Sequence, residues 1–332
     1  MELIKKPLKI RNMELANRLV MAPMATSKAN NGEVTQKLLD YYDEKTKGGY
    51  LGLIITEHQY IRLDGRADPG QISIAEDKDI EGLRKLVKII HDNGSKVLAQ
   101  ISHAGSAAKM HENGFVPISA SAIVHPRLIA KNGMIPQAMS EEEIDEMISL
   151  FVKAANRAKA AGFDGVQLHS AHGYLLNQFY SPLTNKRSDQ YGGSVDQRVL
   201  IHLKMIKAIR EAVGDDHVIA MRLGACDYIE NGSTINDGVV AAKAFAEAGL
   251  DLIDISGGFN GYDKAQAEPG YFSDASFAIK QVVDIPVMLA GGITKKMDID
   301  RLLKEDKADL ISVGRAILKD SDWAKKVMTI DR

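Results

Sequence analysis

Eight short apolar segments recur along the chain of 332 residues, and each is followed by a stretch with the apolar spacing of an amphipathic helix. The segments are RLVMA near residue 20, LGLIIT after Tyr50, KVLAQI after Ser95, GVQLH after Asp164, HVIAMRL after Asp216, DLIDIS after Leu250, PVMLA after Ile285 and DLISV after Ala308. Nearly continuous apolar strands that alternate with helices indicate a parallel sheet buried on both faces. Eight such units favour a single (β/α)8 TIM barrel over a doubly wound sheet.

Local signals predict how the barrel is completed. Before the first unit, LKIRNMEL (8–15) predicts a short N-terminal hairpin that plugs the barrel floor. The helix expected over 140–162 opens with Ser140 and Glu143 at the spacing of a capping box and stops at Gly162. Another helix is expected over 79–94.

Two connections are long enough to form binding loops. One follows the third strand, from His103 to about Met139, and the other follows the fourth, from Ala171 to Ser194. In a barrel both lie on the C-terminal face, where binding loops gather. Since no linker or shift of composition marks a second domain, we expect residues 1–332 to form one domain.

Composition excludes several classes of protein. The formal net charge is −2, with acidic and basic residues interspersed, unlike the basic footprint of a nucleic-acid-binding protein. The N-terminus MELIKKPLKI lacks the apolar core of a signal peptide, and no apolar run approaches the ~18 residues needed to span a bilayer. The one cysteine, Cys226, excludes an internal disulfide and a cysteine-cluster metal site. We expect a cytoplasmic protein that acts on a small molecule, with no nucleic-acid or membrane partner and with a homo-oligomer left open.

Unusual residues end the predicted strands, and in a barrel these positions converge on one site. The strand ends are Ala22-Pro23-Met24-Ala25, Glu57-His58, Gln100 with His103, His169 with His172, Arg222, Ser256-Gly257-Gly258, Gly291-Gly292 and Gly314-Arg315. Glycines after the last two strands fit a phosphate site, because bare backbone N–H groups approach an anion closely there. Arg315 adds a bidentate phosphate donor. The alternative is that these glycines only close tight turns.

Arg222 and Gln100 offer hydrogen bonds inside the predicted barrel mouth. The guanidinium of Arg222 ends an apolar strand and needs an anionic or acceptor partner, and Gln100 both donates and accepts. Together they suit a planar, hydrogen-bonding heterocycle. The alternative for each is a polar residue satisfied within the core.

The motif HSAHGY, from His169 to Tyr174, carries the most specific chemistry. A metal site is disfavoured, because Gln167 stands where a carboxylate ligand would be expected and no strand end supplies a clear ligand set. Two neutral imidazoles can instead donate hydrogen bonds to one carbonyl oxygen, and a nearby tyrosine can deliver a proton to the adjacent carbon. Such a site adds a hydride that a cofactor must supply. The alternative for Tyr174 is an aromatic ring that only packs the loop.

These residues resemble the Old Yellow Enzyme ene-reductases, the NADH:flavin oxidoreductase family. The resemblance covers nearly the whole chain and is most specific in HSAHGYLLNQFYSPLTNKRSDQYGGSVDQR (169–198). NRLVMAPM, AQISHAG, MRLGACDY and ADLISVGRAIL add to it, in order, at the predicted strand ends. The resemblance implies an FMN-dependent enzyme in which NADH or NADPH reduces FMN, and FMN then passes a hydride to the β-carbon of an α,β-unsaturated carbonyl.

The resemblance also implies a role for each matching residue. Pro23 and Met24 match the shelf beneath the flavin ring. Gln100 matches the contact to its pyrimidine edge, and Arg222 matches the cation near N1. The phosphate positions match Gly291, Gly292, Gly314 and Arg315. His169 and His172 match the pair that holds the substrate carbonyl, with Tyr174 as the proton donor.

Several positions depart from the family pattern. Ala25 stands where relatives often carry a cysteine or threonine near the flavin, and Ser27 where one subgroup has a tyrosine facing the substrate. His58 replaces a small residue and is expected to contact the flavin. The residues from Ala22 to Ala25 are expected to contact it as well. Larger relatives carry an iron–sulfur cluster and a second flavin domain, which the single cysteine and the end of the chain at Arg332 do not lead us to expect here.

Two other functions remain as alternatives. One is a metal- or lysine-dependent barrel aldolase or isomerase, which is disfavoured because no strand ends in a well-placed lysine. The other is a non-catalytic flavin-binding barrel, which would have no use for Tyr174.

Overall fold

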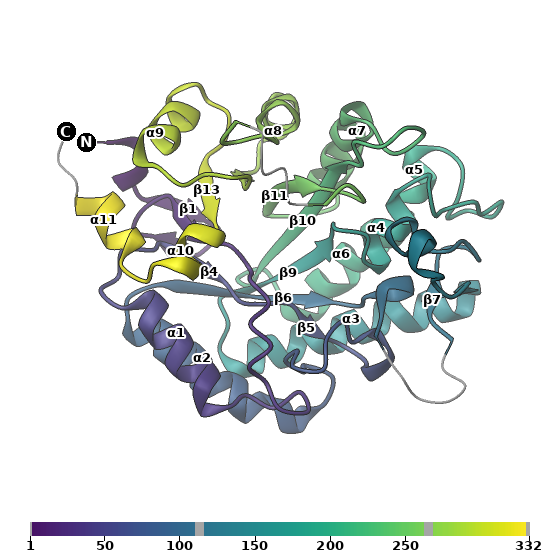
Figure 1. Ribbon diagram of the computed structural model, residues 1–332, viewed down its shortest axis with the longest axis horizontal. Helices are drawn as coiled ribbons and strands as arrows, with labels where there is room; N and C mark the ends of the chain where they lie inside the picture. The colour runs from purple at the N-terminus through teal and green to yellow at the C-terminus, as the bar shows by residue number, and fades with distance from the viewer. Residues whose placement is uncertain (1, 110–115, 262–267, 330–332) are drawn as a thin grey trace.

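Eight parallel strands close into a barrel in the computed structural model, which describes residues 2–109, 116–261 and 268–329 (Figure 1). The barrel strands are β3 (Leu19–Met21), β4 (Leu53–Ile55), β6 (Lys96–Ser102), β9 (Gly165–Ser170), β10 (Val218–Cys226), β11 (Leu252–Gly257), β12 (Val287–Leu289) and β13 (Leu310–Val313). Pairing runs β4-β3-β13-β12-β11-β10-β9-β6, and a further pairing of β4 with β6 closes the ring. The predicted (β/α)8 barrel is confirmed, with all eight strands in the expected segments.

Helices surround the strands and bury their apolar stripes against them (Figure 1). The main helices are α1 (Gln36–Thr46), α2 (Ile80–Asp92), α3 (Glu141–Ala161), α6 (Leu200–Val213), α7 (Ile235–Glu247), α8 (Ser273–Lys280), α9 (Lys296–Lys304) and α11 (Trp323–Thr329). The shorter elements are α4 (Leu175–Tyr180), α5 (Val195–Arg198), α10 (Arg315–Lys319), β5 (Gln59–Tyr60) and the 3-10 turns η1 (Leu3–Lys5), η2 (Leu63–Gly65) and η3 (Asp77–Asp79). Helix α3 begins at the predicted capping box of Ser140 and Glu143, and it ends where Gly162 adopts a φ of +96°.

The predicted hairpin covers the barrel floor. Strands β1 (Leu8–Ile10) and β2 (Met13–Leu15) pair antiparallel, and their apolar side chains join the cluster that fills the lower barrel interior. At the turn, Arg11 donates to Asp251, the buried carboxylate just before β11, which also pairs with Arg210. The hairpin is therefore anchored to the barrel by a charge cluster as well as by apolar contact.

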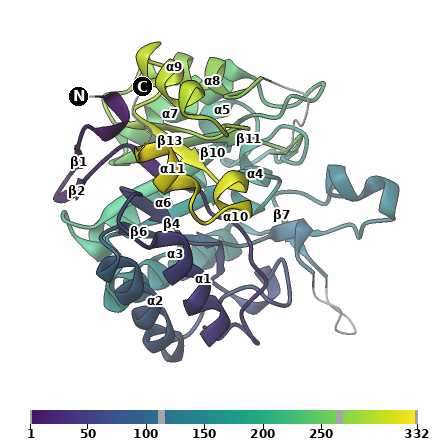
Figure 2. The same ribbon diagram turned by 60° about the vertical axis from the view of Figure 1, so that its left-hand side comes forward.

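The first long connection forms an arm beside the barrel mouth. It contains η4 (Gly105–Ala107), β7 (Ile118–Ser119), η5 (Pro126–Lys131) and β8 (Gln137–Ala138), and Figure 2 shows the segment around β7 extending beyond the ring of helices. We call residues 120–139 the arm. Strands β7 and β8 pair side by side, so the arm leaves and rejoins the barrel at one place.

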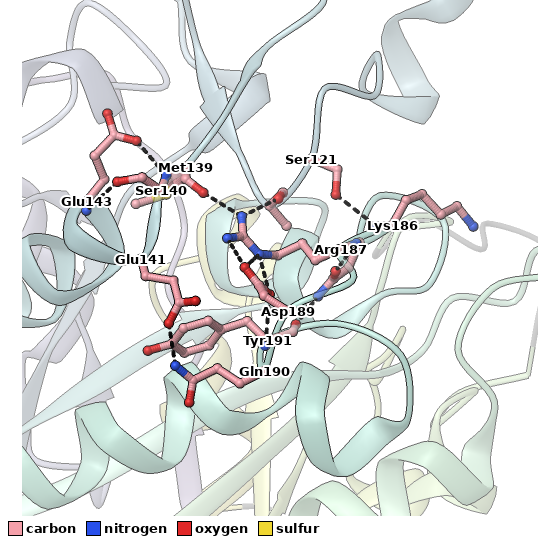
Figure 3. Close-up of polar contacts among 12 residues, drawn as sticks. Ser121, Met139, Ser140, Glu141, Glu143, Lys186, Arg187, Asp189, Gln190 and Tyr191 are labelled. Carbon is pink, nitrogen blue, oxygen red and sulfur yellow. Dashed lines mark hydrogen bonds and ion pairs between the residues drawn. The ribbon is translucent and has the colours of Figure 1, made fainter.

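Arg187, from the second long connection, clamps the arm (Figure 3). Its Nη1 donates to the carbonyl oxygens of Ala120 at 2.8 Å and Met139 at 2.5 Å, which are the two ends of the arm. Its Nε lies 3.0 Å from both carboxylate oxygens of Asp189, and the backbone N–H of Lys186 donates to Ser121 Oγ at 2.9 Å. The two long loops are therefore tied together by a charged group whose side chain is itself largely buried.

Candidate active site

A cavity of about 600 Å³ lies at the carboxyl ends of the barrel strands, a volume typical of ligand sites. Its wall includes Ala22, Pro23, Met24, Ala25, His58, Gln100, Arg127, His169, His172, Tyr174, Arg222, Ser256, Tyr271, Phe272, Gly291, Gly292, Ser312, Gly314, Arg315 and Lys319. Every residue to which the sequence analysis gave a role in binding or catalysis lies in this wall except Ser27. Of the other strand-end residues, Ser256 lines the cavity and Glu57, His103, Gly257 and Gly258 do not. The structure thus brings together residues from strand ends spread over nearly the whole chain.

Ser27 requires a correction. It has a φ of +53°, and its hydroxyl donates to Asp68 Oδ1 at 2.8 Å, so the side chain points away from the cavity. The neighbouring Thr26 donates to Glu57 Oε2 at 2.6 Å, which takes it away from the cavity as well. The structure therefore does not support the expectation that Ser27 faces the substrate.

The HSAHGY motif forms a tight turn that brings its rings together. Strand β9 ends at Ser170, after which His172 and Gly173 both adopt positive φ values, +60° and +79°. A Cβ at Gly173 would lie 2.6 Å from His125 Nε2, so only glycine fits there. The ring centroid of His169 consequently lies 5.1 Å from that of His172 and 4.8 Å from that of Tyr174.

Both imidazoles of the motif are held neutral. Burial is the main cause that lowers the pKa of His169 and of His172 well below the usual value, and the charge of Arg222 adds to the effect. His172 Nε2 shares a hydrogen bond of 2.8 Å with Ser256 Oγ. Nδ1 of His169 is buried without a hydrogen-bond partner among the described residues. A neutral imidazole has one N–H to donate, and these two rings converge on one region of the cavity.

His58 is a third neutral imidazole beside Tyr174, with ring centroids 5.5 Å apart. Burial lowers the pKa of His58 to about 4. Gln71 accepts from the backbone N–H of Ala67 at 2.7 Å, so its amide nitrogen faces His58 Nδ1, also at 2.7 Å. Because Gln71 donates to Nδ1, the proton of His58 resides on Nε2.

The cavity end formed by β12, β13 and α10 fits a phosphate group. A Cβ at Gly314 would lie 2.5 Å from Met24 Sδ, and one at Gly292, where φ is +65°, would lie 2.7 Å from the ring of Tyr271. Arg315 donates from Nη2 to the Tyr271 hydroxyl at 3.0 Å, which holds its guanidinium at the wall. These glycines leave backbone exposed beside a cation, as an anion requires.

Polar groups line the deep part of the cavity, where Gln100 and Arg222 project from β6 and β10. The hydroxyl of Ser312 is buried without a hydrogen-bond partner among the described residues, and Nε of Arg222 makes no hydrogen bond there, only an ion pair with Asp254 at 3.4 Å. A buried donor without a partner costs about 1–3 kcal/mol. A planar heterocycle with a phosphate tail, such as FMN, fits a deep polar edge and a glycine-lined cradle at the other end of one cavity.

Sequence reasoning missed several residues of the wall. Lys319 lies four residues after Arg315 on α10, a spacing that places both side chains on one helix face and was legible in the sequence. Arg127 lies in the arm, whose path no periodic pattern announces. Its Nε donates to the carbonyl oxygen of Phe259 at 2.5 Å, which brings the arm to the loop after β11.

Two other features are absent from the described residues. Within residues 2–109, 116–261 and 268–329, no three histidine, cysteine, aspartate or glutamate side chains are grouped as a metal site requires. No helix in that part of the chain is long and apolar enough to cross a membrane. Arg332 and most of the loop from Asn260 to Gly270 lie outside the described residues.

Known proteins resemble the chain in sequence and in structure. The sequence profile of the NADH:flavin oxidoreductase / NADH oxidase family matches residues 4–330. The chain is 38% identical over 326 residues to the NADH oxidase of Thermoanaerobacter brockii, an alignment that covers 96% of this chain and 49% of that protein. It is 38% identical over 315 residues to the NADPH dehydrogenase of Bacillus cytotoxicus, covering 94% of this chain and 88% of that protein.

A solved structure resembles the fold of this chain. A complex of 2-naphthoyl-CoA reductase with 2-naphthoyl-CoA superimposes with a TM-score of 0.92 at 29% sequence identity, covering 98% of this chain and 52% of that chain. The chain therefore spans about half the length of this reductase and of the NADH oxidase.

Proposed function

Because the chain belongs to the NADH:flavin oxidoreductase / NADH oxidase family, we propose that it is an ene-reductase that reduces the C=C bond of an α,β-unsaturated carbonyl. Family membership implies FMN as the cofactor and NADH or NADPH as the reductant. One observation carries the proposal: two neutral histidines and a tyrosine form one wall of a cavity whose other walls fit FMN.

FMN, when bound, supplies the hydride that it has accepted from the nicotinamide. The deep polar edge, Gln100 with Arg222, would hold its ring, and the shelf from Ala22 to Ala25 would lie against that ring. The phosphate would be held by Gly291, Gly292, Gly314 and Arg315, with Lys319 beside them. His58 would present its Nε2–H toward the same cavity.

His169 and His172 bind and polarise the substrate carbonyl in this proposal. Each donates one N–H to the carbonyl oxygen, and the negative charge that develops on that oxygen is stabilised by donors already in place. Their low pKa values keep them neutral at physiological pH, so the donors need no protonation step. The contact of His172 with Ser256 fixes the orientation of that ring.

Tyr174 delivers the proton to the α-carbon. Its ring lies against His169, so a carbonyl held by the histidines presents its neighbouring carbon to the tyrosine. A phenol has a pKa of about 10 and is protonated at neutral pH. Positioned proton donors of this kind typically contribute 10²- to 10⁴-fold to rate.

The charges of the wall favour a substrate that carries an anionic group. Arg127, Arg222, Arg315 and Lys319 line the cavity, and among the residues that the structure describes no aspartate or glutamate does. The phosphate of FMN would bring about −1.5 to −2 charges and would be held by Arg315 and Lys319. Arg127 comes from a different part of the chain than Arg315 and Lys319, the arm that Arg187 clamps. Its charge contributes to the low pKa of His172. A carboxylate or phosphate of the substrate would complement Arg127, and the related reductase is itself seen with an acyl-CoA.

An absorption spectrum followed through both halves of the reaction tests the proposal. The purified protein should show a flavin band that bleaches when NADH or NADPH is added without oxygen and returns when cyclohexenone is added. The flavin band of Tyr174→Phe should bleach at the normal rate. The rate at which cyclohexenone restores the band should fall 10²- to 10⁴-fold, because only this second half of the reaction uses the proton donor. A wild-type flavin band that bleaches but is restored by no unsaturated carbonyl would refute ene-reduction. A Tyr174→Phe protein with a normal return would remove the tyrosine from the mechanism.

A further inference from the structure

A chain of buried polar side chains lies just beneath the cavity. Gln100 Nε2 donates to Gln167 Oε1 at 2.7 Å, and Gln167 Nε2 donates to Asp254 Oδ2 at 3.2 Å. Asp254 Oδ2 is also 3.4 Å from Arg222 Nε, and Asp254 is fully buried. The chain therefore joins Gln100 and Arg222, the two residues proposed to meet the flavin ring, through a carboxylate that does not itself line the cavity.

Strand register explains how this row of polar side chains spans four strands. Gln100 lies opposite Gln167, and Arg222 lies opposite Asp254. Between them, Gln167 lies opposite Ala220 of β10, whose small side chain leaves room for the amide to reach across to β11. Leu98, Ala220 and Leu252, two residues below these polar positions on their strands, belong to the apolar cluster of the lower barrel. The polar chain is thus the first layer above the apolar interior.

The carboxylate dictates which way each amide points. An ionised carboxylate only accepts hydrogen bonds, so Gln167 must turn its NH2 group toward Asp254 and its carbonyl oxygen toward Gln100. Gln100 must then give one of its N–H groups to Gln167, which leaves its other N–H and its carbonyl oxygen for a ligand. Burial raises the pKa of Asp254, Arg222 and Gln167 oppose that rise, and the resulting pKa of about 6 leaves the carboxylate largely ionised at neutral pH.

We propose that Asp254 is a positioning residue that sets the hydrogen-bonding pattern of Gln100 and offsets the charge of Arg222 at the flavin ring. The inference rests on the proposed binding of FMN. A negative charge beside Arg222 weakens the attraction of this end of the site for an electron-rich ring. Asp254 therefore holds the reduction potential of the bound flavin below the value that Arg222 alone would give.

The test measures the two-electron midpoint potential of FMN-loaded Asp254→Asn. We expect the potential to rise by about 30 mV or more, which corresponds to about a tenfold gain in the affinity for reduced over oxidised FMN. Asp251→Asn is the matched control, because Asp251 is a buried carboxylate just before the same strand but faces the floor, against Arg11 and Arg210. Its potential should equal that of the wild type.

A second variant covers the case in which Asp254→Asn does not fold. Gln167→Met keeps the size of the side chain and the pair of Asp254 with Arg222 but cuts the link to Gln100, so oxidised FMN should bind about tenfold more weakly. An unchanged potential in Asp254→Asn would overturn the inference, as would an unchanged FMN affinity in Gln167→Met. A wild type that binds FMN but reduces no enone would refute ene-reduction alone, because the potential is measured without a substrate.

Discussion

Glu57 makes the stability of this protein depend on pH in a way that one substitution should remove. The side chain follows β4, is 1% exposed and accepts a hydrogen bond from Thr26. Burial raises the pKa of Glu57 from 4.5 to about 7, and Asp68 adds to the rise while Thr26 and Lys28 oppose it. The folded protein therefore binds this proton more tightly than the unfolded chain does.

The sign and size of the effect follow from that difference in proton affinity. As pH rises from 4.5 to about 7, the unfolded chain releases the proton first, so the contribution of Glu57 to stability falls, and above pH 7 the loss is constant. A pKa of about 7 in the folded protein, against 4.5 in the unfolded chain, means that the folded protein binds this proton about 300-fold more tightly, which corresponds to about 3 kcal/mol. Glu57→Gln cannot ionise and should escape this loss.

Urea unfolding of wild type and Glu57→Gln at about pH 5 and about pH 8.5 checks the prediction. The free energy of unfolding of the variant, relative to wild type, should increase by about 2–3 kcal/mol between the two conditions. Glu33→Gln, at an exposed position, serves as the control and should run parallel to wild type. If the free energy of unfolding of Glu57→Gln changes with pH as that of the wild type does, the buried carboxylate is not the origin of the pH dependence.

Three further outcomes are expected. Arg127→Gln should lower kcat/KM for an anionic enone about 10- to 100-fold, because one charged hydrogen bond is lost, and should leave kcat/KM for neutral cyclohexenone unchanged. Steady-state rates with both substrates test this, and equal losses for the two would contradict an anion contact. Gly314→Ala should weaken FMN binding about tenfold, because its Cβ would lie 2.5 Å from Met24 Sδ and push that side chain into the cavity; a flavin fluorescence titration with unchanged affinity would refute this. Because burial keeps the pKa values of His169 and His172 well below 6.5, cyclohexenone affinity should be flat between about pH 6 and pH 8, and a titration near 6.5 in the KM profile would count against neutral histidines.

The barrel could be predicted from sequence because its signals are local. Each apolar run and each capping residue acts within a few positions, and Ser140 with Gly162 delimited α3 correctly. Most of the strand-end residues then converged on one cavity, because the carboxyl ends of the strands of a closed parallel barrel lie on one face. Bounds were less accurate: β10 runs to Cys226, three residues beyond the expected strand.

Features that depend on distant partners were not legible. Asp254 reads as an interruption of an apolar strand, and only the approach of Gln167 across Ala220 gives it a role. His103, at another strand end, faces Asp64 at 3.3 Å and does not line the cavity. The family resemblance placed Ser27 at the substrate, but its positive φ and its hydrogen bond to Asp68 direct the side chain elsewhere.

The clamp at Arg187 has a consequence for how this fold diversifies. Since one guanidinium holds both Ala120 and Met139, the two ends of the arm stay together whatever lies between them. Closing a loop whose ends are already fixed costs little more free energy when its length changes. We therefore expect the segment between the ends, which carries Arg127, to tolerate exchange as long as His125 is kept, because Nε2 of His125 shares a hydrogen bond with the carbonyl oxygen of Gly173. Transplanting it between relatives should transfer substrate preference while the histidines, the tyrosine and the flavin wall stay as they are.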